Sequence, residues 1–197
     1  GVDIRPTIAV TKARITLPEI ADAVARAVLA DAEPGRTLTG LDAGCGEGYY
    51  LRQLAAAAAV EARPLALAGL DISKWAVIAA AKRDKRCNWI VGSNANLPVP
   101  DTSLNRVLCM FGFPVYAEFA RVLKIGGVLL QVDAGADHLR ELREIIYPTL
   151  KAERTSTTAI PDGFTLEATE SVRYALDLVG QQQIADLLAM TQIGRAS

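Results

Sequence analysis

The stretch Leu41-Asp42-Ala43-Gly44-Cys45-Gly46-Glu47-Gly48 joins two segments of different character. The apolar residues 37–43 predict a strand, and the alanine-rich residues 49–60 predict a helix. Three glycines at alternate positions permit a tight turn between them and let a ligand approach the backbone closely. The start of the helix supplies free N–H groups and the positive end of a dipole. The pattern therefore indicates either a ligand-binding turn or a tight connection that binds nothing.

The spacing of the glycines narrows the class of ligand. The dinucleotide fingerprint has two residues before its last glycine, whereas this run is G-x-G-x-G with Asp42 shortly before it. Such a run suits a ligand that carries an amino acid and a nucleoside but no pyrophosphate. We expect Gly44 and Gly46 to approach the amino-acid part, and Asp42 to reach its ammonium group directly or through water.

Strand and helix patterns alternate along the rest of the chain. This alternation predicts an α/β, Rossmann-like fold with a mostly parallel central sheet and helices on both faces. Residues 165–174 alternate like a strand, and we expect them to pair in antiparallel fashion with one further strand at the sheet edge. Glycines 126–127 are expected to stop the helix before them. The remaining strands are predicted over 65–70, 88–91, 106–110 and 128–133, and helices over 18–31, 73–82, 117–123, 138–147 and 181–190.

Polar loops follow the next two strands. Asp71 closes the strand 65–70, where a carboxylate can accept both hydroxyls of a ribose. The loop 92–98 carries Ser93 and Asn94, whose polar atoms can bond the edge of an adenine ring. Ile72 and Leu97 would then sandwich that ring. Because ligands of open α/β sheets bind at the carboxyl ends of the strands, these residues are expected to form one site.

The loop after the strand 106–110 lies where an acceptor would enter. Phe111 and Phe113, followed by Pro114, are candidate substrate contacts, because the two rings could stack on an unpaired base. The alternative is that both rings belong to the core. The loop has no carboxylate or histidine, so the general base stays open between the carbonyl groups of Gly112 or Pro114 and the carboxylate of Asp133.

The composition limits the classes of protein to which the chain can belong. The chain has 197 residues, half of them apolar, and a net charge of −1. No stretch approaches the roughly 18 continuous apolar residues of a membrane span, so we expect a cytoplasmic protein without membrane contact. A domain that holds RNA by itself is usually basic, so an RNA substrate would require a local patch. Lys82, Arg83, Lys85 and Arg86 are such a cluster, or simply a solvated helix end.

Neither the cysteines nor the lone histidine indicates a metal site. Cys45, Cys87 and Cys109 contain no C-x-x-C pair, which argues against a zinc module and against a disulfide framework. His138 is the only histidine and is expected to be a surface or packing residue. We expect no metal in this chain.

The loops together resemble those of class I S-adenosylmethionine-dependent methyltransferases. That class combines D-x-G-x-G-x-G, a ribose-binding acid, a loop ending in L-P and a helix ending L-K-x-G-G. These features correspond to Asp42–Gly48, Asp71, Gly92–Pro98 and Leu123–Gly127. The resemblance covers residues 20 to 135.

A narrower resemblance is to the bacterial 23S rRNA guanine-N1 methyltransferases, the RlmA group. It rests on Asp42–Tyr50, Gly69–Ala76 and Leu97–Ser103, with shorter matches towards residue 191. That group has an N-terminal four-cysteine zinc module thought to help hold RNA, and this sequence has no counterpart of it. Residues 14–18 and the ending after Thr191 also look shortened, so we expect a truncated chain.

The resemblance implies methyl transfer from S-adenosylmethionine, with S-adenosylhomocysteine as product, to N1 of a guanine in 23S rRNA. A small-molecule methyltransferase and a catalytically silent cofactor-binding domain are the alternatives. A single domain is expected over 1–197, with an N-terminal helical segment (1–35), a cofactor-binding core (36–135) and a C-terminal substrate side (136–197); a homodimer is possible. The expected cofactor contacts are Asp42, Gly44, Cys45, Gly46, Gly48, Tyr49, Asp71, Ile72, Ser93, Asn94 and Leu97.

Overall fold

The computed structural model describes residues 2–4, 7–10, 17–33, 35–134 and 160–172. Within these ranges the main sheet has seven strands, and every neighbouring pair is parallel. A second, two-stranded parallel sheet joins β1 (Val2–Ile4) to β8 (Phe164–Leu166). The main sheet consists of β2 (Thr7–Val10), β3 (Leu38–Ala43), β4 (Leu65–Asp71), β5 (Asn88–Val91), β6 (Leu104–Met110), β7 (Leu123–Ala134) and β9 (Thr169–Val172).

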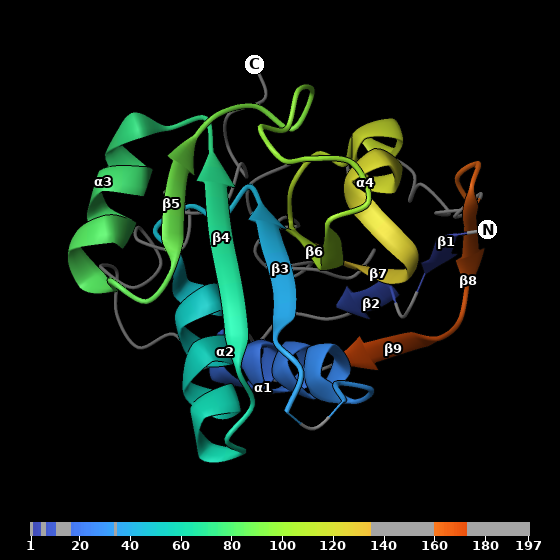
Figure 1. The fold of residues 1–197 in the computed structure, drawn as a ribbon, viewed down its shortest axis with the longest axis horizontal. Coiled ribbons are helices and arrows are strands. Elements are labelled where there is room, and N and C mark those ends of the chain that lie inside the picture. The colour runs from blue at the N-terminus through green and yellow to red at the C-terminus, as the bar shows by residue number, and fades with distance from the viewer. Residues whose placement is uncertain (1, 5–6, 11–16, 34, 135–159, 173–197) are drawn as a thin grey trace, which may run out of the picture.

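The strand order of the main sheet is β5-β4-β3-β6-β7-β2-β9 (Figure 1). Its first five strands follow the order 3-2-1-4-5 when they are numbered along the chain. The order reverses between β3 and β6, so the connections that leave these two strands run to opposite sides. In open α/β sheets this reversal creates a crevice outside the carboxyl ends of the strands, where ligands bind.

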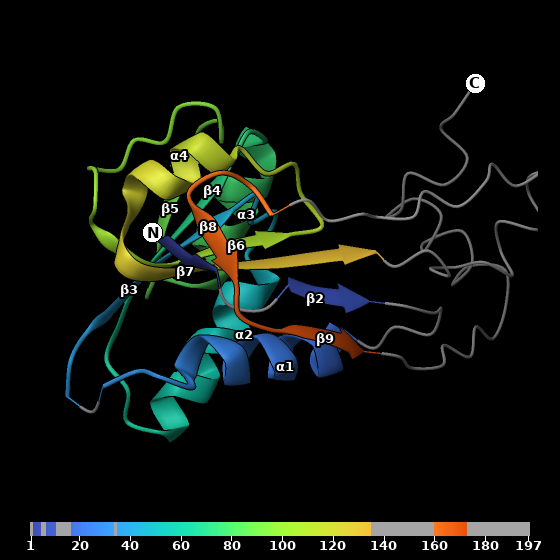
Figure 2. The ribbon, with the colours of Figure 1, turned by 90° about the vertical axis from the view of Figure 1, so that its right-hand side faces the viewer.

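Helices cover both faces of the sheet. Figure 2 shows α1 (Leu17–Leu29) and α2 (Tyr49–Val60) on one face and α4 (Tyr116–Val122) on the other. The connections β3–α2–β4 and β4–α3–β5 run in the same direction along the sheet, so right-handed crossovers put α3 (Lys74–Arg83) on the same face as α2. This arrangement confirms the predicted α/β fold with a parallel sheet. No helix in the described ranges is both long enough and apolar enough to cross a membrane.

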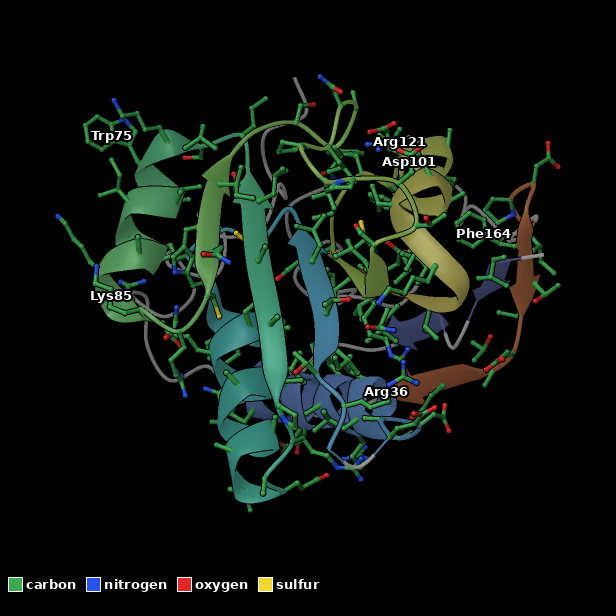
Figure 3. All side chains as sticks on the ribbon, in the orientation of Figure 1. Arg36, Trp75, Lys85, Asp101, Arg121 and Phe164 are labelled. Atoms are coloured by element: carbon green, nitrogen blue, oxygen red, sulfur yellow. The ribbon has the colours of Figure 1, made fainter. Side chains whose placement is uncertain are left out.

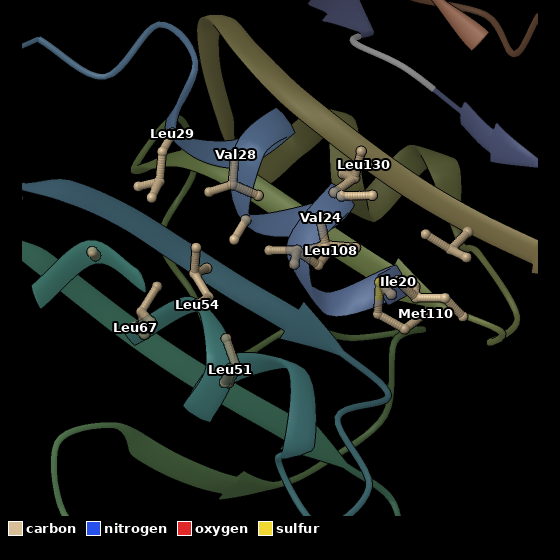
Figure 4. Close-up of a cluster of buried hydrophobic side chains, with 14 of the residues drawn as sticks. Ile20, Val24, Val28, Leu29, Leu51, Leu54, Leu67, Leu108, Met110 and Leu130 are labelled. Atoms are coloured by element: carbon tan, nitrogen blue, oxygen red, sulfur yellow. The ribbon is translucent and has the colours of Figure 1, made fainter. Parts of the chain in front are cut away.

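Each face has its own apolar core. On the first face, α1 presents Ile20, Val24 and Val28 at four-residue spacing, and they pack with Leu108 and Leu130 of the sheet (Figure 4). On the second face, Phe119 of α4 is buried in a separate apolar cluster. Each fully buried aliphatic or aromatic side chain contributes about 1.5–3 kcal/mol relative to exposure, so both layers hold the sheet rigid under the loops at its carboxyl edge.

Three segments differ from the sequence prediction. The strand after α4 begins at Leu123, and Gly126 with φ 74° lies in an irregular part of β7 rather than ending the helix. Residues 165–174 were expected to pair in antiparallel fashion, but β9 pairs in parallel with β2. Strands β1 and β2 precede α1 within the segment that was expected to be helical. The helices predicted over 138–147 and 181–190, and His138, lie outside the described residues.

The packing of Trp89 requires a glycine at two positions of the chain. The indole of Trp89 in β5 lies against Gly48 and Gly69, where a Cβ at Gly69 would come within 2.6 Å of Trp89 Cζ3, and one at Gly48 closer still. Trp89 Nε1 donates a hydrogen bond of 2.8 Å to the Asp84 carbonyl, which fixes the ring. The last glycine of the 41–48 stretch is therefore needed for packing as well as for its φ of 73°.

We predict that Gly69→Ala destabilises the fold more than Gly40→Ala does. The new Cβ at Gly69 would meet both the Trp89 ring and Cys45 Sγ, at 2.9 Å, and such overpacking costs about 1–3 kcal/mol. At Gly40 the nearest atom is the end of the Leu67 side chain, at 3.1 Å, which can yield. Urea denaturation of the two variants checks this, and equal free energies of unfolding would contradict the packing role of Trp89.

Candidate functional site

The glycine turn after β3 is attached to the end of β4. The N–H groups of Gly44 and Cys45 both donate to the Leu70 carbonyl, at 2.8 and 3.0 Å. Gly44 has a φ of 101°, and a Cβ built there would meet nothing within 4 Å. The glycine is therefore required by the backbone conformation, and the space above it stays open for a ligand.

Asp71 strengthens the same connection. One oxygen of its carboxylate accepts the N–H of Gly46 and the other accepts the N–H of Ser73, both at 2.8 Å. The Ser73 hydroxyl in turn accepts the N–H of Ala76 and caps α3. Each carboxylate oxygen can accept a further bond, so Asp71 can hold the turn and still receive ligand hydroxyls.

Asp42 is buried without a hydrogen-bond partner. Its side chain is fully inaccessible, and neither carboxylate oxygen is bonded within the described part of the chain. Burial, and secondly the charge of Asp71, raise the pKa of Asp42 to about 7. The hydroxyl of Tyr50 is likewise buried and unbonded, and burial raises the pKa of that phenol. Two unsatisfied polar groups under the glycine turn are the feature expected where a ligand cation completes the site.

Asn94 joins three loops of the site. Its Nδ2 group lies 3.4 Å from the Ala43 carbonyl at the end of β3 and 3.3 Å from the Phe113 carbonyl in the loop after β6. Its Oδ1 atom is buried and accepts no hydrogen bond from the described residues. Asn94 therefore holds the loop after β5 against both neighbours and keeps one acceptor for a ligand.

Two charged residues of α4 hold the segment that follows. Arg121 donates to the carbonyl groups of Leu97 and Val99, at 3.0 and 2.9 Å, and to the carboxylate of Asp101. Glu118 accepts the Leu97 N–H at 2.8 Å, and its bonds from Arg121 and Leu97 lower the pKa of Glu118 to about 2. The loop 97–101 is thereby fixed to α4, which begins directly after the loop 111–115.

These loops enclose a pocket of about 380 Å³ at the carboxyl edge of the sheet. This volume lies in the range of small-molecule and cofactor sites. The wall includes Phe111, whose φ of 54° is unusual for a residue with a side chain. Such strain is concentrated at functional sites, where the surrounding structure enforces it. The lining residues are Gly44, Leu70, Asp71, Ile72, Gly92, Ser93, Asn94, Ala95, Met110, Phe111, Gly112, Phe113 and Val115.

The predicted site residues fall into two groups. Five expected cofactor contacts and both expected substrate rings lie in the pocket wall: Gly44, Asp71, Ile72, Ser93, Asn94, Phe111 and Phe113. The other expected residues lie behind or beside the described wall. Leu97 packs in the core of the second face, so its expected place on an adenine ring is not where the structure puts it. The remaining members of this second group are Asp42, Cys45, Gly46, Gly48, Tyr49 and Pro114.

The candidates for the general base lie in different places relative to the pocket. Gly112 lines the pocket, whereas Asp133 accepts a hydrogen bond from the side chain of Gln131 in β7 and lies outside the described wall. Burial raises the pKa of Cys87 to about 11 and that of Cys109 to about 12, so both remain neutral thiols. Within the described residues no group of three His, Cys, Asp or Glu side chains could hold a metal ion.

Sequence reasoning missed the residues that support the pocket. Trp89, Glu118 and Arg121 determine how the loops pack, yet none lies in a recognised motif. The spacing of Glu118 and Arg121, three residues apart on one helix, predicts an ion pair but not its bonds to the loop 97–101. Those contacts join residues more than 20 positions apart in the chain.

We predict that Asp42→Asn stabilises the ligand-free protein at pH 8 but not at pH 4. An unfolded aspartate ionises near pH 3.8, whereas Asp42 in the fold ionises near 7, so its contribution to stability is present at low pH and lost as the pH rises through 7. The variant avoids ionisation in a buried site, and a gain on the order of 1–3 kcal/mol at pH 8 is expected.

Thermal melts of the ligand-free wild type and variant at pH 4, 6 and 8 make the measurement. Asp162→Asn, a change at an exposed aspartate, is the matched control. A difference between wild type and Asp42→Asn that does not change with pH would show that Asp42 has an ordinary pKa.

Comparison with known proteins gives a consistent result. A family model described as a methyltransferase domain matches residues 41–127, which contain the pocket loops. A second model, described as GTP cyclohydrolase N terminal, matches residues 1–34. The structure packs α1, which lies in that second range, into the core of the first face.

Three curated proteins align with the chain. A putative 23S rRNA (guanine-N(1)-)-methyltransferase of Bacillus subtilis is 35% identical over 87% of this chain and 62% of its own length. A second protein of that description, from Micromonospora griseorubida, is 36% identical over 52% of this chain and 34% of its length. A malonyl-[acyl-carrier protein] O-methyltransferase of Serratia marcescens is 28% identical over 58% of this chain and 44% of its length.

The chain thus spans less than two thirds of each of these relatives. What the three alignments share with the family model is methyltransferase chemistry, and the strand order, the glycine turn and the acid after β4 agree with it. Residues 41–127 thus form a methyltransferase domain, and the sheet has the strand order typical of class I S-adenosylmethionine-dependent methyltransferases.

Proposed function

We propose that the chain binds S-adenosylmethionine in the pocket at the carboxyl edge of the sheet and transfers its methyl group to N1 of a guanine in 23S rRNA. The observation that carries the proposal is the composition of this pocket. Asp71 and Ile72 line one side of it, and the strained loop with Phe111 and Phe113 lines the other. A nucleoside and a second planar ring can thus be held in one cavity.

The residues present fit this cofactor. Asp71 keeps acceptor capacity for the ribose hydroxyls, and Ile72 provides apolar surface for the adenine. The unbonded Oδ1 atom of Asn94 can accept the adenine amino group. The carboxylate of Asp42, unpaired among the described residues, lies below the turn where the ammonium group is expected, and a cation there favours the ionised form and lowers the pKa of Asp42.

The acceptor side suits an unpaired base. Phe113 is 82% exposed although it lies in the pocket wall, and Phe111 is half-exposed. Exposed aromatic faces at the mouth of a cavity can stack on a base that has been extruded from an RNA loop. The hydrogen bond between Asn94 and the Phe113 carbonyl ties the position of this loop to the cofactor side.

Alignment supplies much of the rate in this chemistry. The cofactor, when bound, provides a reactive sulfonium methyl group, and the protein has to hold the acceptor nitrogen in line with it. The rigid loop between Asn94 and α4 provides that positioning. Gly112 lines the pocket, so its carbonyl is a candidate acceptor for a hydrogen bond from the N1–H group of a guanine held there, and the N1 proton is lost to water at the open mouth.

Methylation of a small molecule is the second candidate function. The Serratia marcescens relative and the absence of an overall basic charge favour it. A domain that binds the cofactor without transferring the methyl group is the third. The three differ in what receives labelled methyl groups, so one set of assays separates them.

We predict micromolar binding of S-adenosylmethionine, about −8 kcal/mol, by calorimetry on the 197-residue chain. Asp71→Ala should weaken it at least tenfold, because the ribose loses its acceptor and the glycine turn loses a hydrogen bond. Asp162→Ala removes an exposed carboxylate elsewhere and should bind as wild type does. Equal affinity in all three proteins would place the cofactor somewhere other than at Asp71.

The acceptor is tested by transfer of labelled methyl groups to unmodified 23S rRNA transcribed in vitro. Methylation at guanine N1 blocks base pairing, so reverse transcription should stop beside one guanine. Label in RNA without such a stop would assign another atom. Label in small molecules alone supports the second candidate, and cofactor binding with no transfer supports the third.

A further inference from the structure

We propose that the outer surface of α3 and the turn after it bind the RNA that flanks the methylated guanine. This inference rests on the proposed function, because it assigns a second contact for the same substrate. The surface, named here the α3 basic surface, consists of Lys74, Trp75, Lys82 and Lys85, all of which are exposed. It begins two residues after Ile72, which lies in the pocket wall.

Positive charge is concentrated on this surface. Residues 74–86 contain five basic residues and one acidic residue, in a chain whose net charge is −1. Arg83 pairs with Glu47, and Arg86 pairs with Asp84 at 2.6 Å, so these two guanidinium groups are engaged within the protein. Across the described residues, Lys74, Lys82 and Lys85 form no ion pair. Three ammonium groups therefore remain for phosphates.

A solvated helix end does not account for all of these charges. Lys82 lies in the last turn of α3, where a cation is favourable beside the negative end of the dipole. Lys74 lies in the first turn, at the positive end, and that turn contains no acidic residue. A cation there is unfavourable in the isolated protein. A phosphate group bound beside Lys74 would offset this unfavourable interaction with the helix dipole.

Trp75 adds a stacking surface beside the lysines. Its side chain is 79% exposed, and Ile72 nearby is 80% exposed. Figure 3 shows Trp75 at the end of α3 that lies at the carboxyl edge of the sheet, and Lys85 near the other end on the same flank. The other tryptophan, Trp89, is packed against glycines, so the exposure of Trp75 is not a general property of tryptophan in this fold.

The combination favours RNA over a protein partner. An exposed aromatic ring between unpaired basic groups is the pattern of single-stranded nucleic-acid binding, where bases stack and phosphates meet cations. A protein interface of similar size would instead bury an apolar centre, and lysine is depleted there. Because the surface adjoins the pocket at Ile72, RNA bound on it can continue towards the acceptor loop.

Filter binding of labelled 23S rRNA transcript to the full 197-residue chain, over a range of salt concentrations, tests the inference. Combined substitution Lys74→Glu, Lys82→Glu and Lys85→Glu should weaken binding at least tenfold. It should also reduce the salt slope by about 2, since each lost phosphate contact removes about 0.7 from the slope on single strands. Trp75→Ala should weaken binding about tenfold with little change in slope, because stacking is not ionic.

Two variants control for a single charge reversal elsewhere and for exposed apolar area. Arg36→Glu changes the charge as Lys85→Glu does, and Figure 3 shows Arg36 at the opposite edge of the sheet. Ile125→Ala removes an exposed apolar side chain from β7. Both should bind rRNA as wild type does. Calorimetric affinity for S-adenosylmethionine should be the same in every variant, which excludes misfolding.

The outcomes separate this inference from the proposed function. If the wild type methylates guanine N1 and the α3 variants bind rRNA equally well, the inference fails and the proposed function stands. If the α3 variants lose rRNA binding but no methyl group enters guanine N1, the α3 basic surface binds RNA while the proposed function fails, and the placement of that RNA beside a methylated guanine fails with it. A wild type that does not bind rRNA, or an α3 surface that holds a protein partner instead, would overturn the inference.

Discussion

The hydrogen bonds between the glycine turn after β3 and the end of β4 are the interactions on which the site depends. The Leu70 carbonyl accepts two N–H groups of the turn, and Asp71 accepts a third from Gly46. These bonds put the turn, the acid and the start of α3 in one rigid unit at the carboxyl edge of the sheet. Trp89 supports the unit from below by filling the space beside Gly48 and Gly69. The glycine turn, Asp71 and the start of α3 therefore determine the shape of this side of the pocket.

A cost in stability accompanies this geometry. Asp42 and the Tyr50 hydroxyl are buried without a hydrogen-bond partner among the described residues, although most buried polar groups in proteins are hydrogen-bonded. The two unpaired groups lie beneath the glycine turn, where we propose that the ammonium group of the cofactor binds. A buried carboxylate without a hydrogen-bond partner is expected in a cation-binding site that is formed before the cation binds. Both oxygens of such a carboxylate remain available to the cation. Asp42 therefore lowers the stability of the ligand-free fold while it provides a carboxylate for the ligand.

The two halves of the site are coupled through Asn94 and α4. Asn94 bonds to the end of β3 and to the loop after β6, and Glu118 and Arg121 fix the segment after Asn94. The loop with Phe111 in a strained conformation, which we propose as the acceptor side, is consequently fixed relative to the loop after β5, which we propose as part of the cofactor side. In-line transfer needs such fixed geometry, because a small displacement of the acceptor atom reduces the rate strongly.

The sequence by itself determined the secondary structure of the core and the residues of the glycine turn and its neighbouring loops. Glycine spacing, the acid after the second strand and the 3.6-residue period of Ile20, Val24 and Val28 all express preferences of neighbouring residues, so the α/β fold and the main pocket loops could be predicted. Only the tertiary structure decided that Leu97 is core, that Gly48 makes room for Trp89, that β9 is parallel, and that Arg121 holds the loop 97–101. Each of these depends on residues far apart in sequence, whose contact follows from how the layers pack and not from any local period.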